Sequence, residues 1–198
     1  MKLIEVLKHI DTRLFLILNG RHNAFWDEIM YWSSKEYAWI PFYLFLLYFT
    51  YRSFSKKTVL ILVCTAVLIT LSDQLSVHLF KNVFMRYRPT HNLVLQPLVH
   101  TVKGYTGGLY GFVSSHASNT FALACFISLL LLNKSKRMAW ILLPWAAFVS
   151  YTRIYLGVHY PLDVIGGALL GAGLAFAVYK LYLYLDKLIY SKTETSNE

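Results

Sequence analysis

Charged residues are scarce in this sequence, and cysteine is almost absent. Of its 198 residues, 15% are charged and 57% are hydrophobic, whereas about 25% of the residues in a typical soluble domain are charged. This composition argues against a soluble enzyme and favours a protein that crosses a membrane several times. The two cysteines, Cys64 and Cys125, both fall within apolar runs, which favours buried apolar side chains over a disulfide or a metal site.

Acidic residues are scarce as well. Lysine and arginine together number 19 against 10 aspartates and glutamates, so the formal net charge is +9. Much of this excess lies between apolar runs, so anionic lipid headgroups or an anionic substrate are better partners than nucleic acid. The chain also lacks a linker rich in glycine, serine or proline and an uncharged secretory signal. We therefore expect one membrane-embedded domain over residues 1–198.

Five apolar runs predict the fold. They cover approximately residues 37–51, 58–80, 117–133, 138–152 and 160–179. Several hold nearer 15 than 20 uncharged residues, which is short for a span, but tyrosine and tryptophan at their ends suit the membrane interface. The predicted fold is all-α: a polytopic membrane helical bundle of five or six spanning helices, within residues 36–188.

The two ends of the chain differ from this bundle. Apolar residues recur at helical spacing near the start: Leu3, Leu7, Ile10, Leu14, Ile17 and Leu18. Charged residues occupy the other faces: Glu5, Lys8, Asp11 and Arg13. This pattern predicts a helix in the interface plane within an N-terminal region of residues 1–35, with a sixth span as the alternative. Asn19-Gly20 indicates a helix end, and residues 189–198 read as a disordered tail.

Basic loops predict the orientation. Three cations lie between the first and second runs, namely Arg52, Lys56 and Lys57, and three between the third and fourth, namely Lys134, Lys136 and Arg137. One crossing per run places both loops on one side, which the positive-inside rule assigns to the cytoplasm. Residues 81–116 and 153–160 then meet on the extracytoplasmic face. We expect an integral protein of a bacterial inner membrane with its active site on that face.

The first polar stretch is Lys81 to Pro89. Lys81 and Arg88 are seven residues apart, so they share a helical face if the helix continues that far. Arg88 can bind phosphate oxygens through two hydrogen bonds, and Lys81 adds a mobile charge. The alternative is a basic cluster that contacts lipid headgroups, and we assign Arg86 to that role.

The second stretch contains Ser114, Ser115 and His116 after a glycine-rich loop. Ser114 or Ser115 can cap the third helix, and the free N–H groups of a helix start bind anions. His116, in the first turn, could protonate a departing oxygen. A serine-rich cap with an incidental histidine is the alternative.

The third stretch contains Arg153, His159 and Asp163. Asp163 lies four residues after His159, so it can accept a hydrogen bond from one imidazole nitrogen and leave the other free to attack. The alternative is an aspartate that stabilises a helix N-terminus, which leaves Arg153 unexplained.

A metal site is the competing chemistry. His116, His159 and Asp163 could supply ligands, but the same pocket would hold three cations whose charges oppose a divalent ion. We therefore expect neither a metal nor a cofactor. His100, in the long loop, has no evident partner and is expected to be solvated.

Taken together, the three stretches resemble the motifs of the type 2 phosphatidic acid phosphatase superfamily, the membrane relatives of vanadium haloperoxidases. The family pattern is K-x6-R-P, P-S-G-H and S-R-x5-H-x3-D. The first motif is intact, and the third has Thr152 in place of serine. The second has Val113 in place of proline and Ser115 in place of glycine. The resemblance covers about residues 70–180.

The resemblance implies a role for each residue. His159 would be the nucleophile that forms a phosphohistidine, Asp163 would orient it, and His116 would protonate the leaving lipid oxygen and later activate water. The implied phosphate-binding residues are Lys81, Arg88, Ser114 and Arg153, with the backbone N–H of Ser115.

The expected activity is metal-independent hydrolysis of a lipid phosphate or diphosphate. Among substrates of similar proteins we favour undecaprenyl diphosphate; phosphatidylglycerophosphate, phosphatidic acid and lipid A phosphates are alternatives, as is transfer of the phosphoryl group to a lipid acceptor. From another class, Val113 and Ser115 could mark an inactive descendant that binds anionic lipid. No oligomeric state is predicted.

Overall fold

The computed structural model describes residues 2–132, 134–135 and 137–194, and that part of the chain is helical throughout, apart from loops and one isolated β-bridge. The α-helices are α1 (Lys2–Asn19), α2 (Ala24–Ser33), α3 (Ile40–Phe54), α4 (Thr58–Leu75), α5 (Asn82–Phe84), α6 (Ser115–Leu131), α7 (Arg137–Tyr155) and α8 (Pro161–Glu194). A π-helix, η3 (Ser76–Lys81), joins α4 to α5. The all-α prediction is confirmed.

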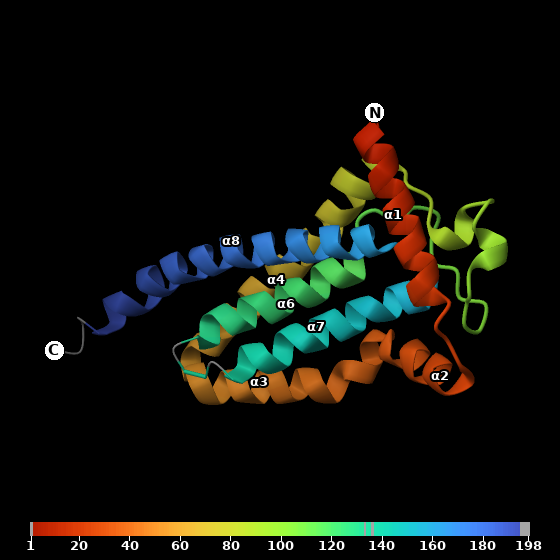
Figure 1. Ribbon diagram of the computed structural model, residues 1–198. Coiled ribbons are helices and arrows are strands. Elements are labelled where there is room, and N and C mark those ends of the chain that lie inside the picture. Colours follow the sequence, from red (N-terminus) through yellow and green to blue (C-terminus); the bar gives the residue numbers. More distant parts are fainter. Residues whose placement is uncertain (1, 133, 136, 195–198) are drawn as a thin grey trace.

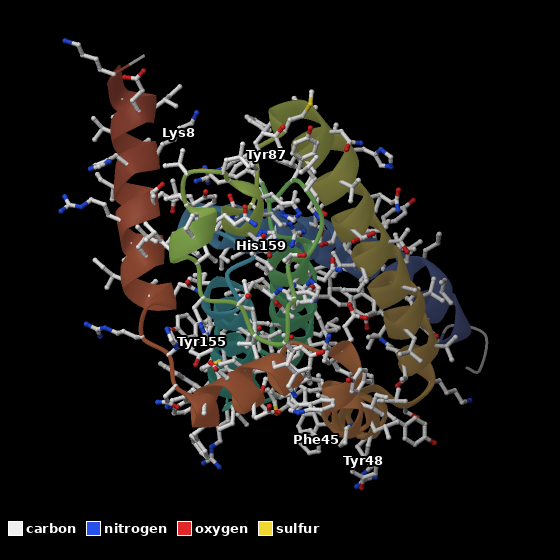
Figure 2. The ribbon with its side chains drawn as sticks, turned by 90° about the vertical axis from the view of Figure 1, so that its right-hand side faces the viewer. Lys8, Phe45, Tyr48, Tyr87, Tyr155 and His159 are labelled. Carbon is white, nitrogen blue, oxygen red and sulfur yellow. The ribbon has the colours of Figure 1, made fainter. Side chains whose placement is uncertain are left out.

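Five helices, α3, α4, α6, α7 and α8, form an elongated bundle (Figure 1). Its core is apolar, and Ile61, Leu68, Phe126 and Leu142 are almost inaccessible to solvent. Large apolar side chains also cover the outside, among them Phe45 and Tyr48 on α3 (Figure 2). Apolar surface on this scale marks contact with a membrane rather than water.

Within the described part of the chain, two continuous helical segments are long and apolar enough to cross a membrane: Glu36–Phe84, which contains both α3 and α4, and Pro161–Tyr190. Helix α6 is a shorter apolar helix. These segments agree with a membrane bundle, while the count of five or six spans stays a prediction.

Helices α6 and α8 approach each other at two glycines of α8. A Cβ atom on Gly167 would overlap the carbonyl oxygen of Ser114, and one on Gly171 would overlap that of Ser118. This small-residue spacing lets two helix backbones pack closely in a membrane. The contact fixes the start of α6 relative to the start of α8.

Helix α1 crosses one end of the bundle at a steep angle to the other helices (Figure 1). It ends at Asn19, as predicted, and its buried residues Asp11, Phe15 and Asn19 follow helical spacing. The expectation that Asp11 lies on a polar outer face is wrong. Asp11 is 2% exposed, and apolar residues such as Leu7 and Leu14 face outward instead.

The two basic loops meet at the other end of the bundle. The Lys134 ammonium donates a hydrogen bond to the carbonyl of Ser53 and lies 4.2 Å from the centre of the Phe54 ring. Lys57 pairs with Asp186 of α8 at 2.9 Å. The loops therefore lie at one end, as predicted; Lys136 falls outside the described residues, and the compartment that this end faces stays a prediction.

The expectation of a disordered tail from residue 189 is wrong for residues 189–194, which are helical. Helix α8 continues to Glu194, and the Tyr190 hydroxyl donates to the carbonyl of Lys56 at 3.2 Å, which anchors this part of the helix. Residues 195–198 lie outside the described part of the chain.

Candidate active site

The three polar stretches converge at the end of the bundle opposite the basic loops. His159 lies near the centre of this end, below the long loop and between α1 and the π-helix (Figure 2). The charges of Lys81, Arg88 and Arg153 all act on its imidazole. Residues up to 78 positions apart in the sequence thus share one site, as the topology predicted.

Lys81 reaches the site from the last turn of the π-helix. Its ammonium donates to the Ser115 hydroxyl at 2.6 Å, and the Ser76 hydroxyl lies 2.5 Å from the same oxygen. Wider turns of this kind are frequent at functional sites. Ser115, which stands where the family motif has glycine, therefore uses its side chain to hold Lys81 in place.

Arg88 reaches the site in a different way from the one predicted. The helix ends at Phe84, and Met85 adopts a left-handed conformation with φ 42°. Residues 86–88 are then paired with residues 109–111, since Arg88 N–H donates to Leu109 O at 3.1 Å and Gly111 N–H to Arg86 O at 2.8 Å. The helix thus ends before Arg88, and the condition for a helical face shared by Lys81 and Arg88 is not met.

Extended backbone explains where these side chains point. Alternation along an extended segment sends Arg86 and Arg88 to one side and Tyr87 to the other. Arg88 is 8% exposed, whereas Tyr87 is 51% exposed. Gly107 packs against the Arg88 guanidinium so closely that a Cβ atom would overlap it. Burial, aided by the charge of Arg153, lowers the pKa of Arg88 to about 10, so it stays protonated at neutral pH.

Arg153 lies in the last turn of α7 and is 2% exposed. Its Nη2 donates to the Tyr105 hydroxyl at 2.7 Å, and its buried Nε has no hydrogen-bond partner among the described residues. Burial raises the pKa of Tyr105, but the charges of Arg153, Arg88 and Lys35 and the hydrogen bond from Arg153 together outweigh this effect, and the pKa is lowered. Two neighbouring buried cations with a free donor make a site for an anion, because buried charges are otherwise costly.

His159 follows a turn at Gly157, which has φ 77°. Its Nδ1 is buried and lies 3.5 Å from Asp163 Oδ2, beyond ordinary hydrogen-bond geometry. Burial, with the charges of Arg88 and Arg153, holds the pKa of His159 well below its usual value. The imidazole is therefore neutral at physiological pH and retains the lone pair that a nucleophile requires.

Asp163 and the serine cap join the starts of α6 and α8. Asp163 Oδ2 accepts from Tyr160 N–H at 3.0 Å, and the Asp163 carbonyl accepts from Ser114 N–H at 2.9 Å. The Ser114 hydroxyl accepts from Ala117 N–H at 3.4 Å, so Ser114 caps α6 as predicted.

Arg86 is the residue whose role the sequence reasoning missed. Its Nη1 donates to Asp163 Oδ1 at 2.8 Å and its Nη2 to Asp11 Oδ2 at 2.7 Å. Its guanidinium carbon lies 3.9 Å from the centre of the Tyr160 ring. The assignment of Arg86 to lipid headgroups is wrong. The signal that could have found it is the spacing of two from Arg88, which places both side chains on one side of an extended segment.

Two cavities meet at His116. An apolar cavity of about 490 Å³ lies between α3, α4, α6 and α7, with Trp39, Leu62 and Leu123 among its walls. A more polar pocket of about 200 Å³ is lined by Tyr105, Arg153 and residues 34–37, of which residues 34–36 also line the apolar cavity. His116 lines both cavities. It therefore stands between a place for an anion and a place for an apolar chain.

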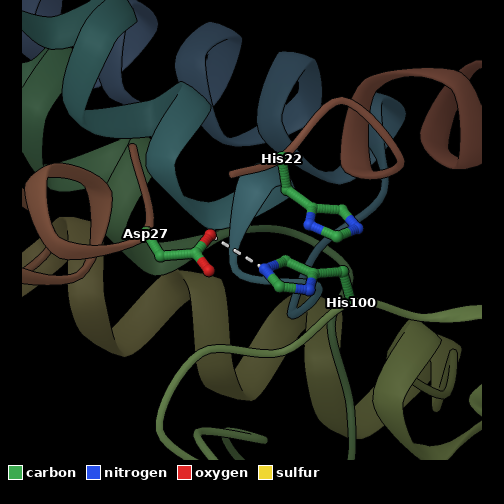
Figure 3. Close-up of side chains that lie close together, drawn as sticks. All are labelled: His22, Asp27 and His100. Atoms are coloured by element: carbon green, nitrogen blue, oxygen red, sulfur yellow. Dashed lines mark hydrogen bonds and ion pairs between the residues drawn. The ribbon is translucent and has the colours of Figure 1, made fainter. Parts of the chain in front are cut away.

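His100 is not a solvated loop residue, contrary to expectation. Its Nε2 lies 2.9 Å from Asp27 Oδ1, and its ring stacks on His22 with centroids 3.6 Å apart and planes 1° from parallel (Figure 3). Parallel, separated rings cannot both point their lone pairs at one ion, which argues against chelation here. The Tyr155 hydroxyl also donates to Asp27, at 2.7 Å. This cluster ties the long loop to α2 and α7.

Comparison with known proteins agrees with these motifs. Residues 62–187 match the profile of the PAP2 superfamily. The chain is 36% identical to a lipid A 4'-phosphatase of Porphyromonas gingivalis over 182 residues, covering 91% of this chain and 76% of the relative. It is 37% identical to one of Bacteroides thetaiotaomicron over 188 residues, covering 94% and 81%. An undecaprenyl-diphosphatase of Sulfolobus acidocaldarius is 31% identical over 172 residues, covering 84% and 75%.

The fold is also similar to a solved structure. A transmembrane PAP2 type phosphatidylglycerolphosphate phosphatase from Bacillus subtilis superposes with a TM-score of 0.65 at 22% identity, covering 93% of this chain and 88% of that one. The chain belongs to the PAP2 superfamily. It is a membrane lipid phosphatase, as the three motifs predict.

Proposed function

We propose that this phosphatase removes a phosphate group from lipid A on the extracytoplasmic face of the inner membrane. Two relatives with that named activity align over more than nine-tenths of the chain, which favours lipid A over the undecaprenyl diphosphate expected from the motifs. The position of His116 between the two cavities carries the proposal. A phosphate held near Arg153 would direct its ester oxygen toward His116 and its acyl chains into the apolar cavity.

The mechanism assigns each step to a residue. Nε2 of His159 attacks phosphorus, and the P–O bond to the lipid breaks as the P–N bond forms. The negative charge of the bound phosphate offsets the burial and the neighbouring cations that disfavour protonation of His116. The protonated His116 then donates a proton to the leaving oxygen, and Asp163 stabilises the imidazolium that develops on His159. Water, deprotonated by His116, then attacks phosphorus, so that the P–N bond breaks and inorganic phosphate leaves. The charge on the phosphoryl oxygens is balanced by Lys81, Arg88 and Arg153 and by the N–H of Ser115, with Ser114 as a further contact.

A panel of lipid phosphates tests this assignment. Purified protein in detergent with excess EDTA is given lipid A, undecaprenyl diphosphate, phosphatidylglycerophosphate and phosphatidic acid, and released phosphate is measured. We expect the highest kcat/KM with lipid A and loss of the 4'-phosphate by mass spectrometry. His159→Ala is the blank. A higher kcat/KM with another lipid would contradict the assignment of lipid A as the substrate. Activity that requires an added divalent metal would contradict the metal-independent mechanism.

Undecaprenyl diphosphate is the second candidate, because relatives named for that activity also align with the chain. The same panel separates the two substrates. Adding a lipid with a free hydroxyl distinguishes hydrolysis from transfer, since transfer yields a new phospholipid in place of inorganic phosphate.

A further inference from the structure

Helix α1 carries a buried carboxylate into the neighbourhood of the active site. Asp11 is 2% exposed, although it lies on a helix whose other charged residues, such as Glu5 and Arg13, are exposed. A carboxylate is rarely buried without a charged partner. The partner here is Arg86, which also pairs with Asp163.

Hydrogen bonds link Asp163, Arg86, Asp11 and Leu162, and the covalent bond between Leu162 and Asp163 closes the ring. Arg86 uses one terminal nitrogen for each carboxylate, at 2.7 Å to Asp11 and 2.8 Å to Asp163. The second oxygen of Asp11 accepts from Leu162 N–H at 2.9 Å, next to Asp163 in the chain. The second oxygen of Asp163 accepts from Tyr160 N–H. Both carboxylates are therefore held at both oxygens.

We infer that Arg86 and Asp11 are positioning residues, which fix the orientation of the Asp163 carboxylate toward His159. The inference rests on the proposed function, in which Asp163 stabilises the imidazolium. Oδ1 is fixed by Arg86, and this leaves Oδ2 directed toward Nδ1 of His159, 3.5 Å away. Asp11 fixes the guanidinium in turn, since its own contact with Leu162 ties it to the same turn of α8.

A purely structural brace would predict a different outcome from a positioning role. Removing a structural brace lowers the midpoint of thermal unfolding, and it lowers activity only by reducing the fraction of folded protein. Removing a positioning residue lowers kcat of the folded protein. It leaves the affinity for phosphate unchanged, because neither Arg86 nor Asp11 is one of the residues proposed to bind the anion. Partners that orient a functional ligand typically contribute 10- to 100-fold to activity when they are removed.

The experiment compares wild type, Arg86→Gln, Asp11→Asn and the double variant, with Arg13→Gln and Glu5→Gln as controls for charge loss on exposed positions of α1. The assay measures kcat and KM on the best lipid of the panel, inhibition by inorganic phosphate, and the thermal unfolding midpoint in detergent. We expect kcat to fall about 10- to 100-fold in Arg86→Gln and less in Asp11→Asn, with the inhibition constant for phosphate unchanged. Arg86→Lys should restore part of kcat.

Coupling decides whether Asp11 acts through Arg86. If it does, Asp11→Asn has no further effect on kcat in the Arg86→Gln background. Multiplicative effects would overturn the inference, as would kcat within twofold of wild type in folded Arg86→Gln. If Arg86→Gln does not fold, folded Asp11→Asn decides the question by itself, and a kcat within twofold of wild type in that variant would overturn the inference. A wild type inactive on every lipid contradicts the proposed function instead.

Discussion

The two ends of the bundle use similar charged residues in opposite ways. At one end Arg153 and Asp163 are almost inaccessible to solvent, and Arg88 is nearly so. At the other end the side chain of Lys57 is 41% exposed, and its partner Asp186 is 23% exposed. An exposed pair of this kind contributes at most about 1 kcal/mol to stability, because water screens it. Buried cations are maintained only where an anion or a specific partner offsets their desolvation.

From this contrast we infer that the exposed charges orient the protein in the membrane and that the buried charges serve the reaction. We expect the basic loops around Lys57 and Lys134 to set the direction of insertion, for which only the total charge matters. In the proposed mechanism the cations around His159 require defined places, because each must reach the same phosphate. Substitutions that preserve charge should therefore be tolerated at one end and not at the other.

The largest effect is expected at His159. His159→Ala removes the proposed nucleophile, so turnover should fall by about 10⁴-fold or more, and no acid-labile phosphoprotein should form. His9→Ala, which removes an exposed histidine of α1, is the control. Phosphate release and trapping of labelled intermediate measure the result. Retention of a phosphoprotein would assign the nucleophile to another residue.

Charge-preserving changes at the two ends sharpen the comparison next. Arg153→Lys keeps the charge but loses the planar donor pair, and we expect kcat/KM to fall about 10²- to 10³-fold. Arg137→Lys, at an exposed residue of the basic end, should leave kcat/KM within twofold. If Arg153→Lys and Arg137→Lys had equally small effects on kcat/KM, the distinction between cations that orient the protein and cations that bind the anion would be wrong.

The effect at His116 should depend on the leaving group. With the lipid substrate, His116→Ala should lower kcat by about 10²- to 10⁴-fold, the usual contribution of a general acid. With p-nitrophenyl phosphate, whose leaving group needs no proton, phosphorylation of His159 should be much less affected. Burst kinetics with each substrate measure this step, and an equal loss with both would contradict the role of general acid.

Acid should destabilise the active-site end through His159. Its folded-state pKa lies below the unfolded value of about 6.5, so the unfolded state binds the proton more readily and stability is lost as pH falls below that value. For each pH unit below the unfolded-state pKa, the free energy of unfolding falls by about 1.4 kcal/mol as long as the native imidazole stays neutral. Thermal unfolding at pH 7.5 and 5.5 should show a larger drop for wild type than for His159→Gln.

Labelling can establish which compartment each end faces, with no effect expected on activity. A cysteine at Thr106, in the long loop, should react with an impermeant thiol reagent in intact cells. A cysteine at Ser135, in the basic end, should react only after the cells are opened. The native Cys64 and Cys125 lie within α4 and α6, and the parent protein serves as the blank. The reverse pattern would place the active site in the cytoplasm.

Local patterns in the sequence predict α1, the five helices of the bundle and eight of the residues around the site, but not α2. Lys81 and His159 could be found because each belongs to a short stretch with recognisable spacing. Arg86 and Asp11 could not, since their pairing depends on the crossing of α1 over the bundle and on an extended turn after Met85. A pairing of residues 75 positions apart leaves no periodic signal in a single sequence, and neither does a cavity between four helices.

The glycine contact between α6 and α8 has a consequence for how this protein can diverge. Gly167 and Gly171 fix the spacing of the reacting groups on one side of α6. The apolar cavity takes its walls from α3, α4 and α7 together with α6. Under the proposed function, in which this cavity holds the hydrocarbon, exchanging wall residues such as Leu44 or Leu62 would alter the accepted lipid without moving the histidines. Selection can reshape the lipid preference of this chain while its chemistry stays constant.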